Sequence, residues 1–235
     1  HYPLRRQRQM CIRDRLHRDG YVLLRGVIPA PWLDELRATF DAGYVPSGEW
    51  PVPRGWDWRH AQLDEDARVQ AVCRLPAVLA AVGALIGERF FLAQVEGREP
   101  VAGGGHQRLH RDAHGQRRGD RVTAMAFFDD YGPHNGATRI VAGTHRQTAD
   151  EAPYDLDDES GAVQICGAAG DILVFDVDVV HGASRNPSGA RRRSLLINYA
   201  AAPLYPALLS TVALRNVRMD TAEQFEPADY AVAGA

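Results

Sequence analysis

Two side chains able to bind a metal ion stand two positions apart in the stretch HQRLHRDAH, which runs from His106 to His114. In an extended strand, residues i and i+2 project from the same face, so His110 and Asp112 would share a face there. An imidazole and a carboxylate placed in this way can bind one metal ion from one side and leave its other positions open. Solvated, arginine-rich turns also contain this tripeptide by chance, so the pair alone does not decide between a metal site and a polar loop.

A third ligand for such an ion is expected on a distant strand, and the sequence offers His181. This histidine follows the apolar run DILVFDVDVV, which predicts a buried strand that ends there and leads into a turn. Two histidines and one carboxylate on one octahedral face are the ligand set of Fe(II) oxygenases. Taken alone, His181 is equally explained as a hydrogen-bonded residue at a strand end. The combination with His110 and Asp112 favours iron.

The stretch RRRSLLINY, which begins ten residues after His181, predicts a further strand. By alternation, Arg192 and Ser194 share one face of it, whereas Arg191 and Arg193 take the other face. An arginine presents a planar fork that fits a carboxylate, and a nearby serine hydroxyl can donate to the same group. The pair predicts an anchor for the far carboxylate of 2-oxoglutarate, whose keto-acid end would chelate the iron. For two of the three arginines, a solvated basic turn is the simpler explanation.

Together, the motifs LHRD, HNGATRIVAGTHR and GDILVFDVDVVHGASRNPSGARRRSLLINY resemble the phytanoyl-CoA dioxygenase family of Fe(II)- and 2-oxoglutarate-dependent oxygenases. The resemblance extends from about Asp19 to Tyr199. By position, it assigns iron binding to His110, Asp112 and His181, and 2-oxoglutarate binding to Arg192, with O₂ as the other co-substrate. Halogenases similar to this family have a small residue in place of the aspartate. The resemblance therefore implies hydroxylation or a related oxidation.

The resemblance also suggests further side chains of the pocket. Three are expected to face the co-substrate: Ser194, Gln94 and Thr138. Three more are expected to contact a polar or zwitterionic small-molecule substrate: Glu96, Arg98 and Arg139. Glu96 and Arg98 qualify because they share the strand face of Gln94. For Gln94 and Thr138, ordinary sheet surface is the alternative.

The elements that would position these residues are mainly short strands. Apolar or alternating runs separated by turn residues predict strands near 89–100, 121–131, 137–143, 161–167, 171–180 and 193–201. Before them, the sequence predicts a strand near 21–27, a helix from Pro31, a loop over 45–60, and helical structure over 67–86 that is interrupted near Pro76 and ends at Gly87. The expected fold class is an all-β core with flanking helices. The resemblance specifies a double-stranded β-helix, which is a cupin-like jelly roll.

Composition limits the other classes of function. The 235 residues, 45% of them apolar, suit one large domain, and the net charge of −3 gives no reason to expect a nucleic-acid partner. No apolar run is long enough to span a bilayer, so a membrane protein is not expected. Three widely separated cysteines form no zinc or disulfide pattern, which favours a reducing, cytoplasmic setting. The sequence indicates no oligomeric state.

The first fifteen residues differ from the rest. All 27 basic residues of the chain are arginine, as expected of a GC-rich gene, but the stretch MCIRD back-translates to AT-rich codons that resemble a sequencing adapter. We therefore expect residues 1–15 to be non-native or disordered, and residues 16–235 to form a single Fe(II)/2-oxoglutarate oxygenase domain. A short native basic tail is the alternative.

The predicted activity is hydroxylation of a C–H bond of a polar small molecule, with release of succinate and CO₂. Two alternatives remain. A non-catalytic jelly-roll binding module would be indicated by the loss of a metal ligand, and none is lost. A metal-dependent cupin-type enzyme that does not use 2-oxoglutarate would have no need of the arginine–serine pair.

Overall fold

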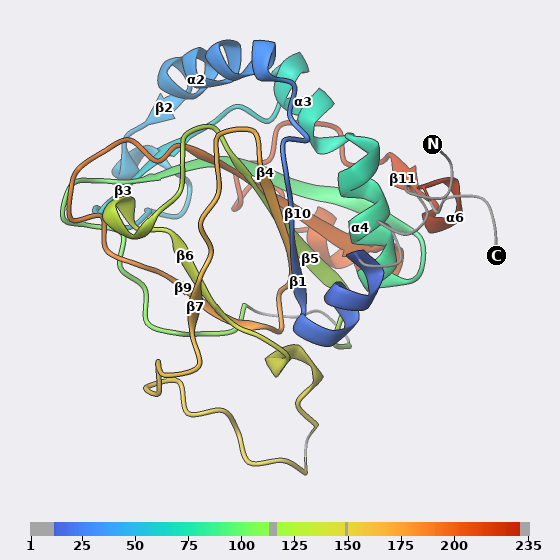
Figure 1. Ribbon diagram of the computed structural model, residues 1–235. Helices are drawn as coiled ribbons and strands as arrows, with labels where there is room; N and C mark the ends of the chain where they lie inside the picture. Colours follow the sequence, from blue (N-terminus) through green and yellow to red (C-terminus); the bar gives the residue numbers. More distant parts are fainter. Residues whose placement is uncertain (1–11, 113–116, 149, 231–235) are drawn as a thin grey trace.

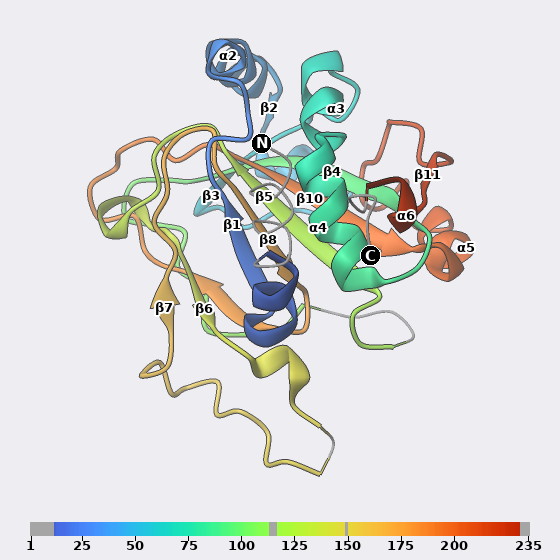
Figure 2. The ribbon, with the colours of Figure 1, turned by 45° about the vertical axis from the view of Figure 1, so that its right-hand side comes forward.

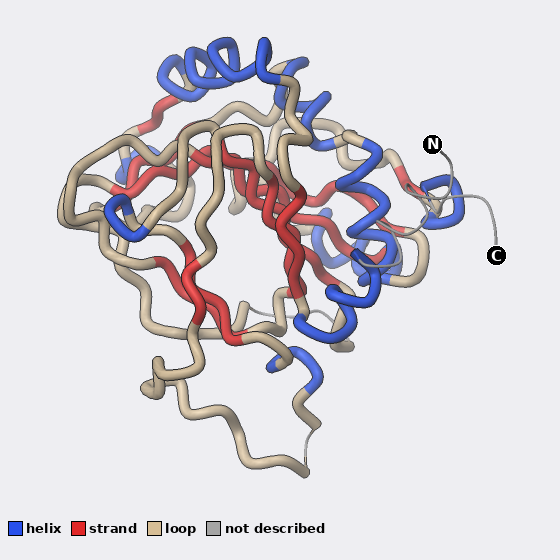
Figure 3. Tube along the Cα trace, in the orientation of Figure 1, coloured by secondary structure: helices blue, strands red, loops and turns tan. Residues whose placement is uncertain are grey.

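A large antiparallel sheet runs through the computed structural model, which describes residues 12–112, 117–148 and 150–230 (Figure 1). Its strand order is β1-β8-β5-β10-β4-β3-β2, with β11 paired to β4, and a smaller sheet has the order β7-β6-β9. The strands of the large sheet are β1 (Tyr21–Leu24), β8 (Ile172–Asp176), β5 (Arg121–Phe127), β10 (Ser194–Ala201), β4 (Phe90–Pro100), β3 (Trp58–Ala61), β2 (Tyr44–Val45) and β11 (Gln224–Phe225). Those of the smaller sheet are β7 (Val163–Gln164), β6 (Thr138–Val141) and β9 (Val180–Ala183). Figure 3 shows the two sheets as separate groups of strands, which confirms the predicted strand-rich core.

Helices flank the large sheet (Figure 2). They are α2 (Leu33–Ala42), α3 (Ala67–Cys73), α4 (Pro76–Ile86), α5 (Tyr205–Leu209) and α6 (Pro227–Tyr230), and residues 12–19 are also helical. Short 3-10 turns are η1 (Ala30–Trp32), η2 (Ser47–Glu49), η3 (Pro133–Asn135), η4 (Thr144–Arg146) and η5 (Ala202–Leu204). The predicted break at Pro76 is confirmed, since the proline opens α4, and Gly87 ends that helix with a left-handed φ of 73°.

Side chains of β10 alternate between the two faces of the large sheet. Leu195, Ile197 and Tyr199 belong to the main apolar core, which also contains the buried residues of α3 and α4. Ser194 and Leu196 point the other way and line a cavity. Burying one leucine-sized side chain contributes about 1.5–3 kcal/mol to stability. The helical layer can therefore hold the sheet together from one face, while the other face is available for polar residues.

Two predicted elements differ from the structure. The segment over 45–60, expected to be a loop, contains the last residue of β2, all of η2 and most of β3, and β3 pairs with β4. The run over 171–180, expected to be one strand, contains β8, a turn at 177–179 and the first residue of β9, which belongs to the other sheet. In this turn, the backbone N–H of Val179 donates to the carbonyl of Asp176 at 3.0 Å. The carboxylate of Asp176 also accepts from the backbone N–H of Asp178 at 2.9 Å. Both strands are apolar and buried, so hydropathy alone did not mark the boundary.

Residues 1–11 of the proposed non-native segment lie outside the described residues, and residues 12–15 belong to the helix over 12–19. Leu16, expected to be near the start of the native sequence, is fully buried in the main core. The boundary between residues 15 and 16 stays a prediction. In the described part of the chain, no single helix is long and apolar enough to cross a membrane. The pair α3 and α4 reaches the required length and hydropathy only together, and it is bent by 48° at its break.

Candidate metal centre and co-substrate pocket

The main chain sets His110 and His181 directly opposite each other. His110 was expected in a strand. In the structure it forms only one isolated antiparallel bridge, with His181 of β9. The N–H of His110 donates to the carbonyl of His181 at 2.8 Å, and the reverse bond is 2.9 Å long. A third bond, from the N–H of Asp112 to the carbonyl of Val177 at 3.1 Å, continues the pairing. The two segments are therefore held in register, and the imidazole centroids lie 4.5 Å apart.

The carboxylate of Asp112 lies between the two imidazoles. Its Oδ1 is 3.6 Å from Nε2 of His110, and its Oδ2 is 3.6 Å from Nε2 of His181. These separations are too long for good hydrogen bonds. One donor atom from each of the three residues lies within 4.8 Å of the other two, so the group could hold a metal ion. The structure thus brings together the three residues predicted from sequence.

Each histidine is fixed with Nε2 free. Nδ1 of His110 lies 2.8 Å from the carbonyl of Arg108, and Nδ1 of His181 lies 2.9 Å from the carbonyl of Val179. A carbonyl can only accept, so each Nδ1 carries a proton and donates it, which leaves the Nε2 lone pair directed toward Asp112. A metal-binding histidine usually makes such a bond through its other nitrogen. The donor chemistry of the site therefore fits a divalent metal.

The pKa shifts of Asp112 and His181 suit metal binding, whereas the adjacent carboxylate of Asp112 raises the pKa of His110. Burial alone would raise the pKa of Asp112, but the adjacent imidazoles of His110 and His181 lower it below its ordinary value. Burial lowers the pKa of His181, which favours its neutral form. A metal ion needs an ionised carboxylate and neutral imidazoles. Asp112 and His181 are thus held in the protonation states that coordinate.

Arg192 reaches the same cavity as the three donors. Its side chain is fully buried, with Cζ 4.7 Å from the ring centroid of Tyr131 and 5.5 Å from that of Trp58. Its Nη1 donates to the carbonyl of Gly136, but its Nε has no hydrogen-bond partner. No ion pair joins Arg192 to a carboxylate within the described parts of the chain. A buried, uncompensated guanidinium is costly, so this position fits an anionic ligand such as the carboxylate of 2-oxoglutarate.

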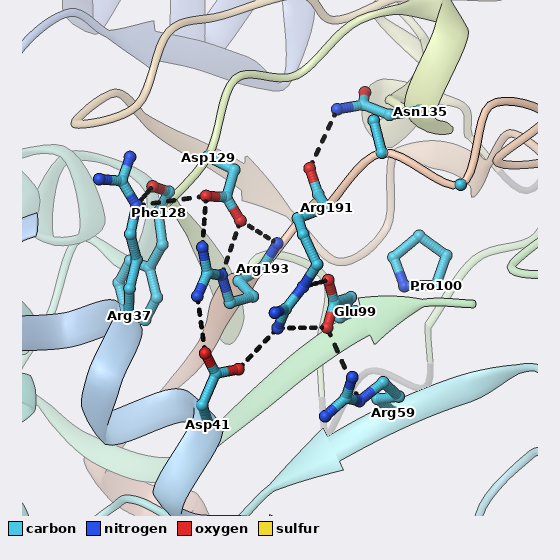
Figure 4. Close-up of polar contacts among 12 residues, drawn as sticks. Arg37, Asp41, Arg59, Glu99, Pro100, Phe128, Asp129, Asn135, Arg191 and Arg193 are labelled. Atoms are coloured by element: carbon cyan, nitrogen blue, oxygen red, sulfur yellow. Dashed lines mark hydrogen bonds and ion pairs between the residues drawn. The ribbon is translucent and has the colours of Figure 1, made fainter. Parts of the chain in front are cut away.

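Arg191 and Arg193 do not line the cavity, which agrees with the strand alternation. Figure 4 shows both side chains turned toward carboxylates. Arg193 donates from Nε and Nη2 to the two oxygens of Asp129, each at 2.9 Å, and from Nη1 to Asp41 of α2 at 2.9 Å. Arg191 donates to Glu99 from Nε and from Nη2, the latter at 2.9 Å, and its Nη2 also donates to Asp41 at 2.6 Å. These two arginines tie β10 and its preceding segment to α2 and β4, and leave Arg192 between them facing inward.

Of the residues expected at the co-substrate, Thr138 and Ser194 line the cavity, but Gln94 does not. The Ser194 hydroxyl donates to the carbonyl of Arg98 at 2.7 Å, so its proton is already used there. Gln94 is turned toward Glu96, to which its Nε2 donates at 3.4 Å. The sequence reasoning missed Trp58 and Tyr131, which pack against the Arg192 guanidinium. The abundance of tryptophan in the segment over 45–60 was the available signal for Trp58.

Of the residues expected at the substrate, Arg98 lines the cavity, whereas Glu96 and Arg139 do not. Glu96 is buried, and its oxygens are bound by Nδ1 of His60 at 2.6 Å and by Nη2 of Arg54 at 2.8 Å. Arg139 forms an ion pair with Glu159 at 2.5 Å. The expectation took their strand positions into account but could not anticipate these partners. Arg98 is therefore the one residue of the three that the structure places in contact with the cavity.

The buried Glu96 carboxylate predicts an acid-sensitive contribution to stability. Burial alone would raise its pKa, but the bond from His60 and the charges of Arg98 and Arg54 lower it below the ordinary value of 4.5. The folded protein then takes up this proton at a lower pH than the unfolded chain. The stabilisation is fully present above about pH 4.5 and is lost as the pH falls through the depressed folded-state pKa.

Melting temperatures measured across this acidic range should therefore fall more steeply for the wild type than for Glu96→Gln. The control is Glu35→Gln, because Glu35 pairs with Arg68 on the surface, where both side chains are partly exposed. Its pH profile should follow that of the wild type. A Glu96→Gln profile parallel to the wild-type one would contradict the prediction.

Comparison with known proteins decides the family. A sequence model described as phytanoyl-CoA dioxygenase (PhyH) matches residues 16–194, which is most of the chain. The chain belongs to the phytanoyl-CoA dioxygenase family. This confirms the resemblance that the motifs indicated, and it places the chain among the oxygenases that depend on iron and 2-oxoglutarate. In this family member, the residues His110, Asp112 and His181 fit iron, and the buried Arg192 fits 2-oxoglutarate.

A curated relative of this phytanoyl-CoA dioxygenase family member comes from Stutzerimonas stutzeri and is named a probable alpha-ketoglutarate-dependent hypophosphite dioxygenase. The two are 32% identical over 109 residues, which are 38% of this chain and 37% of the relative. The match therefore spans little more than a third of that protein.

Solved structures show the same fold. The alpha-ketoglutarate-dependent epimerase SnoN of nogalamycin biosynthesis superposes with a TM-score of 0.68 and 21% identity, over 83% of this chain and 84% of SnoN. AviO1 from Streptomyces viridochromogenes Tue57 superposes with a TM-score of 0.66 and 20% identity, over 83% and 95% of the two chains. At such identities the likeness concerns the fold alone, and it confirms the predicted jelly roll with flanking helices.

Proposed function

We propose that this family member hydroxylates a C–H bond of a polar small molecule while 2-oxoglutarate is converted to succinate and CO₂. The observation that carries the proposal is that one cavity is lined both by the donors of His110, Asp112 and His181 and by the buried, uncompensated guanidinium of Arg192. A metal-binding module without the co-substrate would explain the first feature but would leave the second as an unexplained cost.

Each residue has a distinct task in this reaction. Iron and 2-oxoglutarate, when bound, supply the oxidising power for C–H cleavage, which protein side chains lack. His110, Asp112 and His181 would hold the metal, and the carbonyl partners of the two histidine Nδ1 atoms keep the imidazole rings oriented. Arg192 would bind the far carboxylate of 2-oxoglutarate through two parallel hydrogen bonds.

The aromatic residues around Arg192 shield this contact from water. Tyr131 is buried and packs against the guanidinium, and it stacks on Phe127 with the ring planes 6° apart. A charge-assisted hydrogen bond is stronger in such a low-dielectric setting than in water. Asp112 would supply a carboxylate ligand where halogenases similar to this family have a small residue, which favours hydroxylation over halogenation.

The named reactions of similar proteins do not select the substrate. One acts on hypophosphite by its name, and the solved structures include an epimerase and a carbocyclase. Hydroxylation is therefore proposed from the residues of this cavity. A small-molecule partner and a cytoplasmic location stay predictions made from the sequence.

A succinate-release screen tests the proposal. The protein is loaded with Fe(II) without oxygen and mixed with 2-oxoglutarate, air and members of a metabolite library. His181→Ala serves as the control for background succinate. Substrate-dependent succinate with a product heavier by one oxygen atom is the expected result. Failure of the wild-type protein to bind 2-oxoglutarate would favour a binding module or a cupin-type enzyme instead.

A further inference from the structure

The cavity contains a second arginine, on its outer side. Arg98 lies on β4 opposite Ser194 of β10, and its side chain is 27% exposed, whereas Arg192 is buried. The Cζ atoms of Arg98 and Arg192 lie 5.6 Å and 5.5 Å from the ring centroid of Trp58. Both guanidinium groups therefore lie beside the same indole, and a molecule that enters from solvent can reach Arg98 while Arg192 is occupied.

The carboxylate of Glu96 is shared between Arg98 and two closer partners. Oε1 of Glu96 is 3.6 Å from Nη2 of Arg98, but Glu96 has closer partners in His60 at 2.6 Å and Arg54 at 2.8 Å. The Nε of Arg98 is buried and has no hydrogen-bond partner. Glu96 carries one negative charge against the two positive charges of Arg54 and Arg98, so one positive charge is left over, and Nε of Arg98 is a donor without an acceptor.

A count of charges shows what remains after the cofactors bind. The charged side chains that line the cavity, among the described residues, are Arg98, Arg192 and Asp112, with the histidines taken as neutral. Fe(II) and the 2-oxoglutarate dianion cancel each other. One positive charge is then left in a partly buried site, and a partly buried charge without a counter-ion is unfavourable.

We propose that the substrate is an anion and that Arg98 binds its carboxylate or phosphonate group. This inference rests on the proposed function, because it assigns Arg192 to 2-oxoglutarate and the triad to iron. The guanidinium of an arginine can donate two hydrogen bonds to either kind of oxyanion, and the indole of Trp58 provides an apolar surface beside it. The reacting C–H bond of the substrate would then lie on the metal side of its anionic group.

The test is a binding measurement with small probes. The wild-type protein is first loaded with Fe(II) under nitrogen and titrated with 2-oxoglutarate in a calorimeter. With both bound at saturation, it is titrated with acetate, with methylphosphonate, and with acetamide, which matches the shape of acetate without its charge. Acetate or methylphosphonate should bind at least about tenfold more tightly than acetamide, as expected for a charge-assisted hydrogen bond.

Variants assign the preference to Arg98. Arg98→Met should weaken anion binding by roughly tenfold to hundredfold and leave 2-oxoglutarate binding unchanged. Arg98→Lys should recover part of the loss, because it keeps the charge without the fork. The matched control is Arg59→Met, which removes the same charge from the neighbouring strand β3, where Arg59 pairs with Glu99 and packs over Tyr44. It should bind the probes as the wild type does.

Three results would overturn the inference. The first is equal affinity of the wild type for acetate, methylphosphonate and acetamide. The second is a loss of 2-oxoglutarate affinity in Arg98→Met as large as the loss of anion affinity, which would make Arg98 a co-substrate residue. The third is the same anion loss in Arg59→Met, which would indicate a general effect of surface charge. If the wild type does not bind 2-oxoglutarate in the first titration, the proposed function itself is wrong.

Discussion

His181→Ala and His110→Ala should each abolish metal binding and substrate-dependent succinate formation. Each change removes one of only three protein donors, and the remaining two cannot hold the ion on one face. Loss of a residue that merely orients a ligand already lowers metal affinity or activity by about 10–100-fold. Loss of the ligand itself should therefore cost more than about a hundredfold. Metal content after loading with Fe(II) and desalting, measured by elemental analysis, checks this directly.

Folding must be separated from metal binding in these variants. His181 is buried beside Phe175, with the ring centroids 4.9 Å apart, so its removal also leaves a small cavity. His110 is partly exposed, so His110→Ala should keep a melting temperature close to that of the metal-free wild type. His134→Ala is the matched control, because His134 is exposed in η3 and does not line the cavity. Unchanged metal content in both ligand variants would show that His110 and His181 do not bind the metal.

The candidate metal donors could be picked out from sequence because their types and local spacing carry the chemistry. His110 and Asp112 are two residues apart, so a short extended segment is enough to put them on one face. His181 follows an apolar run that was expected to be buried. What spacing could not supply was the element that holds His181. Its strand belongs to the smaller sheet and begins after a turn at 177–179. The residues on both sides of this turn are apolar and buried, so the sequence pattern did not show the turn.

The inward direction of Arg192 was predictable, but the reason it is held so firmly was not. Alternation along β10 separates Arg192 from its two neighbours. The partners of those neighbours, Asp41 and Asp129, are about 150 and 64 residues away in the chain (Figure 4). Ion pairs at such separations follow from the packing of α2 on the sheet, and no local pattern indicates them.

The substrate side of the cavity was the least predictable part. Glu96 and Arg98 share a strand face, and both were predicted to contact the substrate. In the structure Glu96 is bound by Arg54, 42 residues away, and by His60. These contacts turn Glu96 away from the cavity, whereas Arg98 lines the cavity and its Nε has no hydrogen-bond partner. The difference arises from the segment expected to be a loop: Arg54 lies in its irregular part, whereas His60 and Trp58 lie on β3, and all three contact Glu96 or Arg98.

Arg192→Met should raise the KM for 2-oxoglutarate roughly tenfold to hundredfold, because a charge-assisted hydrogen bond contributes about 1.5–3 kcal/mol and about 1.4 kcal/mol corresponds to one decade. Methionine keeps an aliphatic side chain against Trp58 and Tyr131, so the loss concerns the charge and the fork. Metal content should stay at the wild-type value, since Arg192 is not a donor. Arg192→Lys should recover only part of the affinity.

Arg191→Ala and Arg193→Ala remove the same charge from the same segment and are the controls. Both should lower the free energy of unfolding, because they break the ion pairs to Glu99, Asp41 and Asp129, while the KM for 2-oxoglutarate stays near the wild-type value. Succinate formation against 2-oxoglutarate concentration, together with urea unfolding, separates the two effects. A large KM change in Arg191→Ala or Arg193→Ala with none in Arg192→Met would shift the anchor by one residue. No KM change in any variant would mean that 2-oxoglutarate is held elsewhere, and the buried guanidinium would then need another anion.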